Sequence, residues 1–131
     1  APYFPFNELK AFADMAHNCV FMTSGFRRTI DLAGADDVVY CDPPYEPMPG
    51  TAGFTAYAAG GFTWDDQELL AERCVEAHKR GARVVISNAS APKILDLYRE
   101  HGFNLQFINA RRSISCKSST REVAKDVVAI L

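Results

Sequence analysis

The sequence has 131 residues, of which 48% are apolar, 11% aromatic and 23% charged, and its formal net charge at pH 7 is −2. This length and composition predict one globular domain and exclude a wholly disordered chain. The charge excludes a surface that is basic all round, so any nucleic-acid contact has to come from basic residues gathered locally. Because no run of about 18 apolar residues is present, we expect no transmembrane helix and no membrane partner.

The first predicted element is a helix whose apolar residues recur at helical spacing. Its apolar stripe consists of Leu9, Phe12, Ala13 and Ala16. Asn7 is expected to cap its N-terminus. The apolar run 19–22 is expected to form a buried strand, and residues 26–33 a helical turn that ends at Gly34. The β-branched run 38–41 predicts a strand that is covered on both faces.

The middle of the chain combines a long loop with a helix and a strand. Residues 42–61 are rich in Pro, Gly, Ala and Thr and have no periodicity, which predicts the loop. Thr63 is expected to cap the helix, with Asp66 three residues on and Gly81 at its end. The apolar run within 83–87 then predicts a second buried strand.

The last third of the chain predicts one more helix and a pair of strands. Ser90 and Pro92 are expected to open the helix and Gly102 to end it. Alternating residues predict a strand over 103–108, which is expected to continue toward 112–115, and the final strand is expected at 127–131. The order β-α-β-α-β-β predicts an α/β fold with a parallel centre and a terminal antiparallel hairpin.

The four cysteines predict free thiols. They are Cys19, Cys41, Cys74 and Cys116, and they form neither a CxxC pair nor a Cys/His cluster. We therefore expect reduced cysteines and no metal site.

Polar side chains follow the two central strands of the predicted sheet. Asp42 comes directly after the first of these strands, and Ser87 and Asn88 come at the end of the second. A right-handed crossover makes the two strands neighbours, and the binding crevice of such a sheet lies at the carboxyl ends of its strands. We therefore expect the three side chains to face one crevice.

The most specific motif is Asp42-Pro43-Pro44-Tyr45. Asp before Pro is a common turn, but here it follows an apolar strand and precedes a glycine-rich loop, which favours a catalytic role. An exocyclic amino group is a poor nucleophile because its lone pair is conjugated with the ring. The Asp42 carboxylate and the Pro43 carbonyl can accept its two hydrogens and stabilise the positive charge that develops. Tyr45 offers a flat face on which an extruded base can stack.

This motif and its surroundings resemble the Dam-like DNA adenine-N6 methyltransferases. The matching segments, in chain order, are VYCDPPY (39–45), TAGFTAY (51–57), GFT (61–63), VISN (85–88) and RRSIS (111–115). The resemblance implies transfer of a methyl group from S-adenosylmethionine to the N6 amino group of a flipped adenine in double-stranded DNA, often within GATC. It also implies a cytoplasmic protein of a bacterium or phage.

The resemblance assigns roles to individual residues by position. It places Asp42, Pro43, Pro44 and Tyr45 in the catalytic motif, with Asp42 also bordering the cofactor. The residues that it implies in substrate or DNA binding are Phe54, Thr55, Tyr57, Ser87, Asn88, Arg111 and Arg112.

Two features of the family are missing from the sequence, namely the Phe-x-Gly-x-Gly-type cofactor loop and the target-recognition region. The sequence also starts without Met. We therefore expect residues 1–131 to be the C-terminal portion of one methyltransferase catalytic domain, a partial Rossmann-like sheet without its N-terminal strands. We expect it to be inactive alone and to need the N-terminal half of the same polypeptide as its partner.

Two alternatives stay open. One is an RNA or ribosomal-RNA amino-methyltransferase, although those more often begin the motif with Asn where this chain has Asp42. The other is a non-catalytic remnant or binding module of the same fold, in which residues 42–45 form only a turn.

Overall fold

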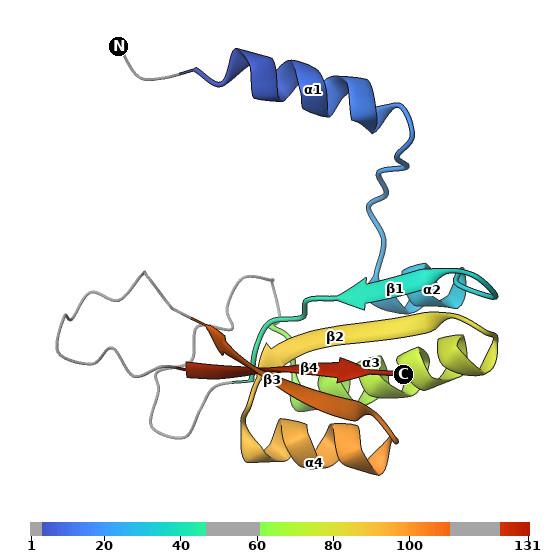
Figure 1. Ribbon diagram of the computed structural model, residues 1–131. Helices are drawn as coiled ribbons and strands as arrows, with labels where there is room; N and C mark the ends of the chain where they lie inside the picture. The colour runs from blue at the N-terminus through green and yellow to red at the C-terminus, as the bar shows by residue number, and fades with distance from the viewer. Residues whose placement is uncertain (1–3, 47–60, 111–123) are drawn as a thin grey trace, which may run out of the picture.

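A computed structural model describes residues 4–46, 61–110 and 124–131. The predictions for Phe54, Thr55, Tyr57, Arg111 and Arg112 lie outside the described residues, as do most of the predicted loop and the continuation of the 103–108 strand. The described elements are α1 (Phe6–Ala16), α2 (Phe26–Asp31), β1 (Val38–Cys41), α3 (Trp64–Lys79), β2 (Arg83–Ala89), α4 (Pro92–Glu100), β3 (Asn104–Ala110) and β4 (Ala124–Ile130) (Figure 1).

The described strands form one mixed sheet in the order β1-β2-β4-β3. β1 and β2 are parallel and adjacent, with Val39 opposite Val84, so the predicted neighbour relationship is confirmed. β3 and β4 form the predicted antiparallel hairpin, and β4 lies between β3 and β2. The α/β class is therefore confirmed.

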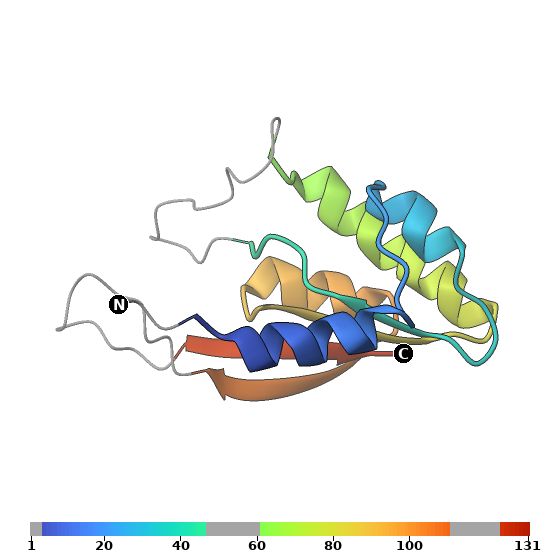
Figure 2. The same ribbon diagram turned by 90° about the horizontal axis from the view of Figure 1, so that it is seen from above.

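Helices α2, α3 and α4 lie on one side of the sheet (Figure 2). The core between these layers is apolar, and its members include Leu70, Cys74, Ile86, Ile94 and Val127. In β1, Val39 and Cys41 pack against this core, whereas Val38 and Tyr40 are 59% and 65% exposed. The strand predicted to be covered on both faces is thus covered on one face by the described residues.

The predicted boundaries of α3 are confirmed. Thr63 and Asp66 form a reciprocal capping box, in which the Thr63 amide donates to the Asp66 carboxylate at 2.9 Å and the Asp66 amide donates to the Thr63 hydroxyl at 3.3 Å. Gly81 ends the helix with φ +100°, and a Cβ there would lie 3.1 Å from Cα of Ala35. Only glycine meets both requirements without strain.

Two predicted helix starts shift slightly. α1 begins at Phe6 with Pro5 as its N-cap, and Asn7 makes no cap, because the Pro5 carbonyl already accepts the first helical hydrogen bond from Leu9 at 3.0 Å. α4 begins with Pro92 as predicted, but its N-cap is Ala91 instead of Ser90.

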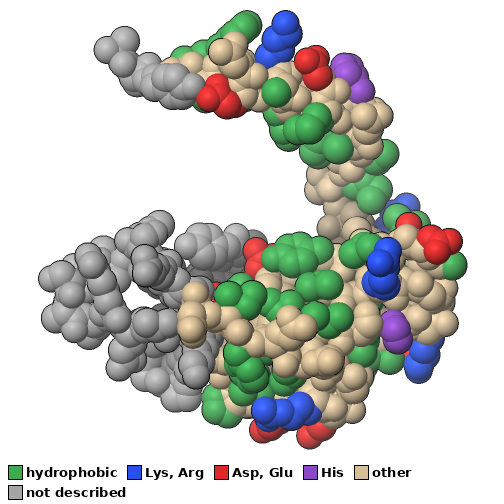
Figure 3. All heavy atoms as spheres, viewed as in Figure 1, with side chains coloured by type: hydrophobic (Ala, Val, Ile, Leu, Met, Phe, Trp, Pro, Cys, Tyr) green, Lys and Arg blue, Asp and Glu red, His purple; other side chains and the backbone are tan. Residues whose placement is uncertain are grey.

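The strand predicted at 19–22 is wrong, because these residues are in no strand. Val20, Phe21 and Met22 are 84%, 73% and 56% exposed. A strand needs a neighbour for its backbone hydrogen bonds, and the described residues place none beside this segment. Helix α1, just before it, stands apart from the sheet and buries none of its residues (Figures 1 and 3).

Among the described helices, none combines the length and apolar character needed to cross a bilayer.

Candidate active site

The 42–45 turn leaves the carboxyl end of β1 beside the carboxyl end of β2, as predicted. The Ser87 hydroxyl donates to Oδ1 of Asp42 at 2.8 Å. The Tyr40 hydroxyl lies 3.2 Å from Ser87 Oγ. Because the single Ser87 proton goes to the carboxylate, Tyr40 is the donor in that second contact. The turn is thus fixed to β2 through a charge-assisted hydrogen bond, and Asp42 otherwise stays exposed.

The opposite side of the turn is held from α3 and β2. The Gln67 side chain donates through Nε2 to the Pro44 carbonyl at 2.9 Å, and the Glu46 amide donates to Oδ1 of Asn88 at 3.2 Å. Pro43 and Pro44 have no N–H, so the turn depends on such contacts at its remaining backbone groups.

Gln67 was missed in the sequence analysis, although the sequence carries a signal for it. It precedes Leu70, Ala71 and Cys74 at spacings of three, four and seven residues, so a polar residue occupies the apolar stripe of α3. Its exposure is 1%. A buried amide at such a position indicates a specific hydrogen-bond partner.

Asn88 is fully buried, and protein groups occupy both ends of its amide. Nδ2 donates to Oε1 of Gln67 at 3.2 Å and to the Tyr98 hydroxyl at 3.1 Å. Oδ1 accepts from the Glu46 amide and, at 2.8 Å, from the Ala89 amide. The predicted contact between Asn88 and substrate stays a prediction. In this structure the Asn88 side chain holds the backbone at the end of the turn, through the Glu46 amide.

Tyr45 is half-buried beside the Asp42–Ser87 pair. Burial raises the pKa of its hydroxyl, the Asp42 and Asp126 carboxylates raise it further, and the Ser87 hydroxyl acts in the opposite sense. The phenol is therefore neutral at physiological pH, so Tyr45 presents an uncharged ring next to a carboxylate. This is the combination expected for holding a base and polarising its amino group.

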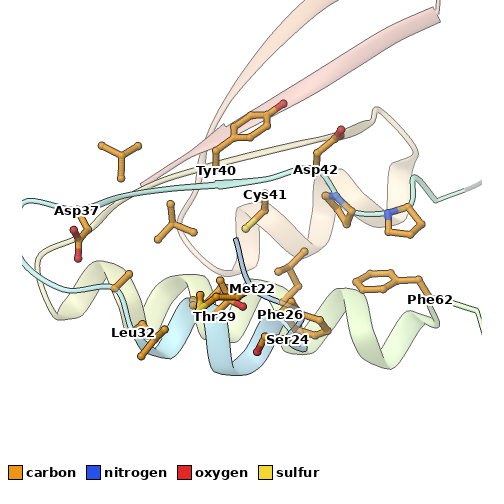
Figure 4. A pocket seen from close by; sticks show the side chains of 17 residues that line it. Met22, Ser24, Phe26, Thr29, Leu32, Asp37, Tyr40, Cys41, Asp42 and Phe62 are labelled. Carbon is orange, nitrogen blue, oxygen red and sulfur yellow. The ribbon is translucent and has the colours of Figure 1, made fainter. Parts of the chain in front are cut away.

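A hollow of about 650 Å³ lies along β1 between the strand and α2. Phe26 and Phe62 line it, and Figure 4 shows Asp37 and Asp42 at its opposite ends. Its volume lies within the range of small-molecule sites, and Asp42, Pro43 and Pro44 form part of its wall.

Cys41 and Cys74 bring their sulfur atoms to 3.9 Å at the base of the turn. The contact with Cys74 lowers the pKa of Cys41, while the same contact, together with burial, raises the pKa of Cys74. Cys19, Cys41 and Cys74 are all free, as predicted.

Within the described ranges, no three His, Cys, Asp or Glu side chains converge as a metal site would require.

The chain matches one family model and several curated proteins. A family model described as D12 class N6 adenine-specific DNA methyltransferase matches residues 1–114. A DNA N-6-adenine-methyltransferase of Escherichia phage P1 is 46% identical over 130 residues, covering 99% of this chain and 17% of the phage protein. DNA adenine methylases of Vibrio cholerae O395 and Escherichia coli K12 are 41% and 37% identical, each over 98% of this chain and 46% of its relative. The chain thus spans less than half the length of these relatives.

Proposed function

The chain belongs to the D12 class of N6 adenine-specific DNA methyltransferases, and we propose that it forms the amino-group-binding part of such an enzyme's catalytic domain. The proposed substrate is a flipped adenine in double-stranded DNA, within GATC by resemblance. The observation that carries the proposal is the Asp42 carboxylate, which stands exposed at the carboxyl end of β1 and is held there by Ser87.

In the proposed reaction, Asp42 and the Pro43 carbonyl accept the two hydrogens of the adenine amino group. As the amino nitrogen forms a bond to the methyl group, the bond between that methyl group and the donor sulfur would break, and the nitrogen would carry a positive charge until it releases one of its two protons. The two oxygens stabilise that charge more strongly than they stabilise the ground state. Tyr45 stacks on the extruded base. By resemblance, Phe54, Thr55, Tyr57, Arg111 and Arg112 contact the DNA around it.

S-adenosylmethionine supplies the methyl group in this proposal. The described residues fit only part of it. Asp42 suits a neighbouring cationic centre, but the described lining of the hollow contains no Lys, Arg or His for the carboxylate of the donor's amino-acid part. We propose that the cofactor site is completed by the glycine-rich loop of an N-terminal half.

The apolar surface that the described residues expose supports the proposal of an N-terminal half. All but two of the large apolar side chains that the described residues expose lie before residue 41, the exceptions being Phe107 and Ile108. Most of these side chains lie on α1, in the 19–22 segment and on the exposed face of β1. Figure 3 shows some of them along α1 and the segment after it. Exposed apolar surface of this extent marks an interaction site. We propose that N-terminal strands pair with β1 and with residues 19–22 and thereby complete a Rossmann-like sheet.

The test uses the full-length enzyme, meaning this chain preceded by an N-terminal half with a glycine-rich cofactor loop. We expect it to methylate adenine in a GATC duplex and not in an RNA of the same sequence, as measured by transfer of labelled methyl groups. Asp42→Ala should lower kcat by about 10²–10³-fold or more. Asp96→Ala, which removes an exposed carboxylate on α4, is the matched control. Normal turnover by Asp42→Ala would leave residues 42–45 as a structural turn, and methylation of the RNA would favour the alternative substrate.

A further inference from the structure

Behind the 42–45 turn, three buried polar side chains from three elements form one hydrogen-bonded group. Gln67 from α3, Asn88 from β2 and Tyr98 from α4 are 1%, 0% and 0% exposed. Asn88 links the other two, because its Nδ2 donates to both. Burying polar groups in an apolar core is unfavourable unless each finds partners, so such a group indicates a geometric requirement at that place.

The requirement concerns Tyr45. The Pro44 carbonyl, just before Tyr45, accepts from Gln67 at 2.9 Å, and the Glu46 amide, just after it, donates to Asn88 at 3.2 Å. The two contacts thus hold the backbone on both sides of a single residue. The two side chains that make these contacts, Gln67 and Asn88, are hydrogen-bonded to each other, so a shift of one is coupled to a shift of the other.

We propose that Gln67 and Asn88 are positioning residues that set the pose of the Tyr45 ring, with Tyr98 holding Asn88 from behind. The inference rests on the proposed function, because it assigns these residues to the capture of the flipped base. A stacking face has to meet the base within a fraction of an ångström while Asp42, held by Ser87, meets the amino group. Ser87 also acts on the Tyr45 hydroxyl, and Gln67 and Asn88 add a second support at the backbone on either side of Tyr45.

The identity of residue 67 follows from this role. Its amide has to donate to the Pro44 carbonyl and accept from Asn88 at the same time, and among side chains of this length only glutamine does both. Glutamate would place an oxygen against the Pro44 carbonyl oxygen. Methionine would keep the length and remove both hydrogen bonds.

The experiment compares Gln67→Met with two controls in the full-length enzyme. Gln106→Met makes the same change at an exposed glutamine of β3, and Ile94→Val removes a methyl group from the buried core while leaving these hydrogen-bonding groups in place. We expect Gln67→Met to lower kcat by about 10- to 100-fold, the effect of misplacing a reacting group by about 1 Å, with KM for DNA unchanged. Thermal unfolding of all three variants separates this effect from general destabilisation.

A double-mutant cycle supplies the decisive measurement. If Gln67 acts through Tyr45, Gln67→Met should have little further effect on kcat in a Tyr45→Ala background, whereas the effect of Ile94→Val should persist there. 2-Aminopurine at the target position should report less captured base in Gln67→Met. Tyr98→Phe, which removes only the hydroxyl at the far end of the group, should act in the same direction but less strongly.

Additive effects of Gln67→Met and Tyr45→Ala would overturn the inference, as would a normal kcat in Gln67→Met. If Gln67→Met does not fold, the same cycle with Tyr98→Phe decides the question. Asp42→Ala distinguishes failure of the proposed function from failure of the positioning role of Gln67. Full activity in that variant contradicts the proposed function itself, whereas loss of activity there together with a silent Gln67→Met contradicts only the positioning role.

Discussion

The Ser87 hydroxyl lies 2.8 Å from Oδ1 of Asp42 and ties the end of one strand to the end of its neighbour. Ser87 is 8% exposed, whereas Asp42 is exposed, so the contact runs from the protein interior to a carboxylate that solvent reaches. A hydroxyl in this place fixes the direction of the carboxylate and leaves its negative charge intact, whereas a cationic partner would neutralise that charge. The negative charge therefore stays available to an amino group that becomes positive.

Removal of the Ser87 hydroxyl should affect turnover more than DNA binding. A hydrogen bond to a charged group contributes about 1.5–3 kcal/mol. Since each 1.4 kcal/mol corresponds to about tenfold in rate, Ser87→Ala should lower kcat of the full-length enzyme by about tenfold or more. Ser87→Thr keeps the hydroxyl and should retain most of the activity. Val85→Ala, on the same strand, controls for lost side-chain volume, and equal turnover of Ser87→Ala and wild type would contradict the prediction.

Tyr45 should matter through its ring. Tyr45→Ala should weaken capture of the flipped base by about 1–3 kcal/mol, the usual contribution of a base–aromatic stack, as measured by 2-aminopurine fluorescence at the target position. Tyr45→Phe keeps the ring and should be mild. Equal damage in the two variants would mean that the hydroxyl beside Ser87, and not the aromatic face, is what the site uses.

The 131-residue chain alone should neither transfer methyl groups nor bind S-adenosylmethionine. Its described residues offer no cationic partner along the hollow beside Asp42, and its sequence has no Phe-x-Gly-x-Gly-type loop. Calorimetry should therefore show no heat of binding at micromolar concentrations of the chain. Adding the N-terminal half should restore binding, and tight binding by the chain alone would refute the prediction.

Cys41 should be a more reactive thiol than its partner. The sulfur contact with Cys74 lowers the pKa of Cys41, so at a given pH below the usual cysteine pKa a larger fraction of Cys41 is thiolate. Alkylation by iodoacetamide, located by mass spectrometry, should modify Cys41 before Cys74, whose pKa is raised. Cys74→Ala should raise the pKa of Cys41 and slow its alkylation near pH 8, with exposed Cys19 as the internal reference. An unchanged rate would show that the sulfur contact does not set the reactivity.

The sequence predicts the parts of this fold that local chemistry determines. Thr63 with Asp66 specifies a helix start and Gly81 a helix end, because each device works within a few residues. The neighbouring strands β1 and β2 also follow from their sequence, since a crossover connection has few alternatives.

Prediction from the sequence fails where the structure of a segment or the role of a side chain depends on a partner that is distant along the chain. Residues 19–22 have the composition of a strand, but backbone pairing needs a second strand, and the described residues supply none. The role of Gln67 was missed for a related reason, because its partners Pro44 and Asn88 lie more than twenty positions away along the chain. Asn88 was expected to face the same crevice as Asp42 and Ser87, but its side chain is fully buried and is hydrogen-bonded to Gln67 and Tyr98, partners that lie on other elements.

The position of β4 in the sheet has a consequence for how the protein is made. A chain synthesised from its N-terminus presents β2 and β3 before β4, yet β4 lies between them. Val127 and Val128 pair with Asn88 and Ser87, the residues that hold the 42–45 turn. Pairing between distant segments forms slowly and only after both have emerged. A partly synthesised chain therefore carries the complete 42–45 motif but lacks the strand that fixes its supports, and the site takes shape only after residues 124–130 arrive.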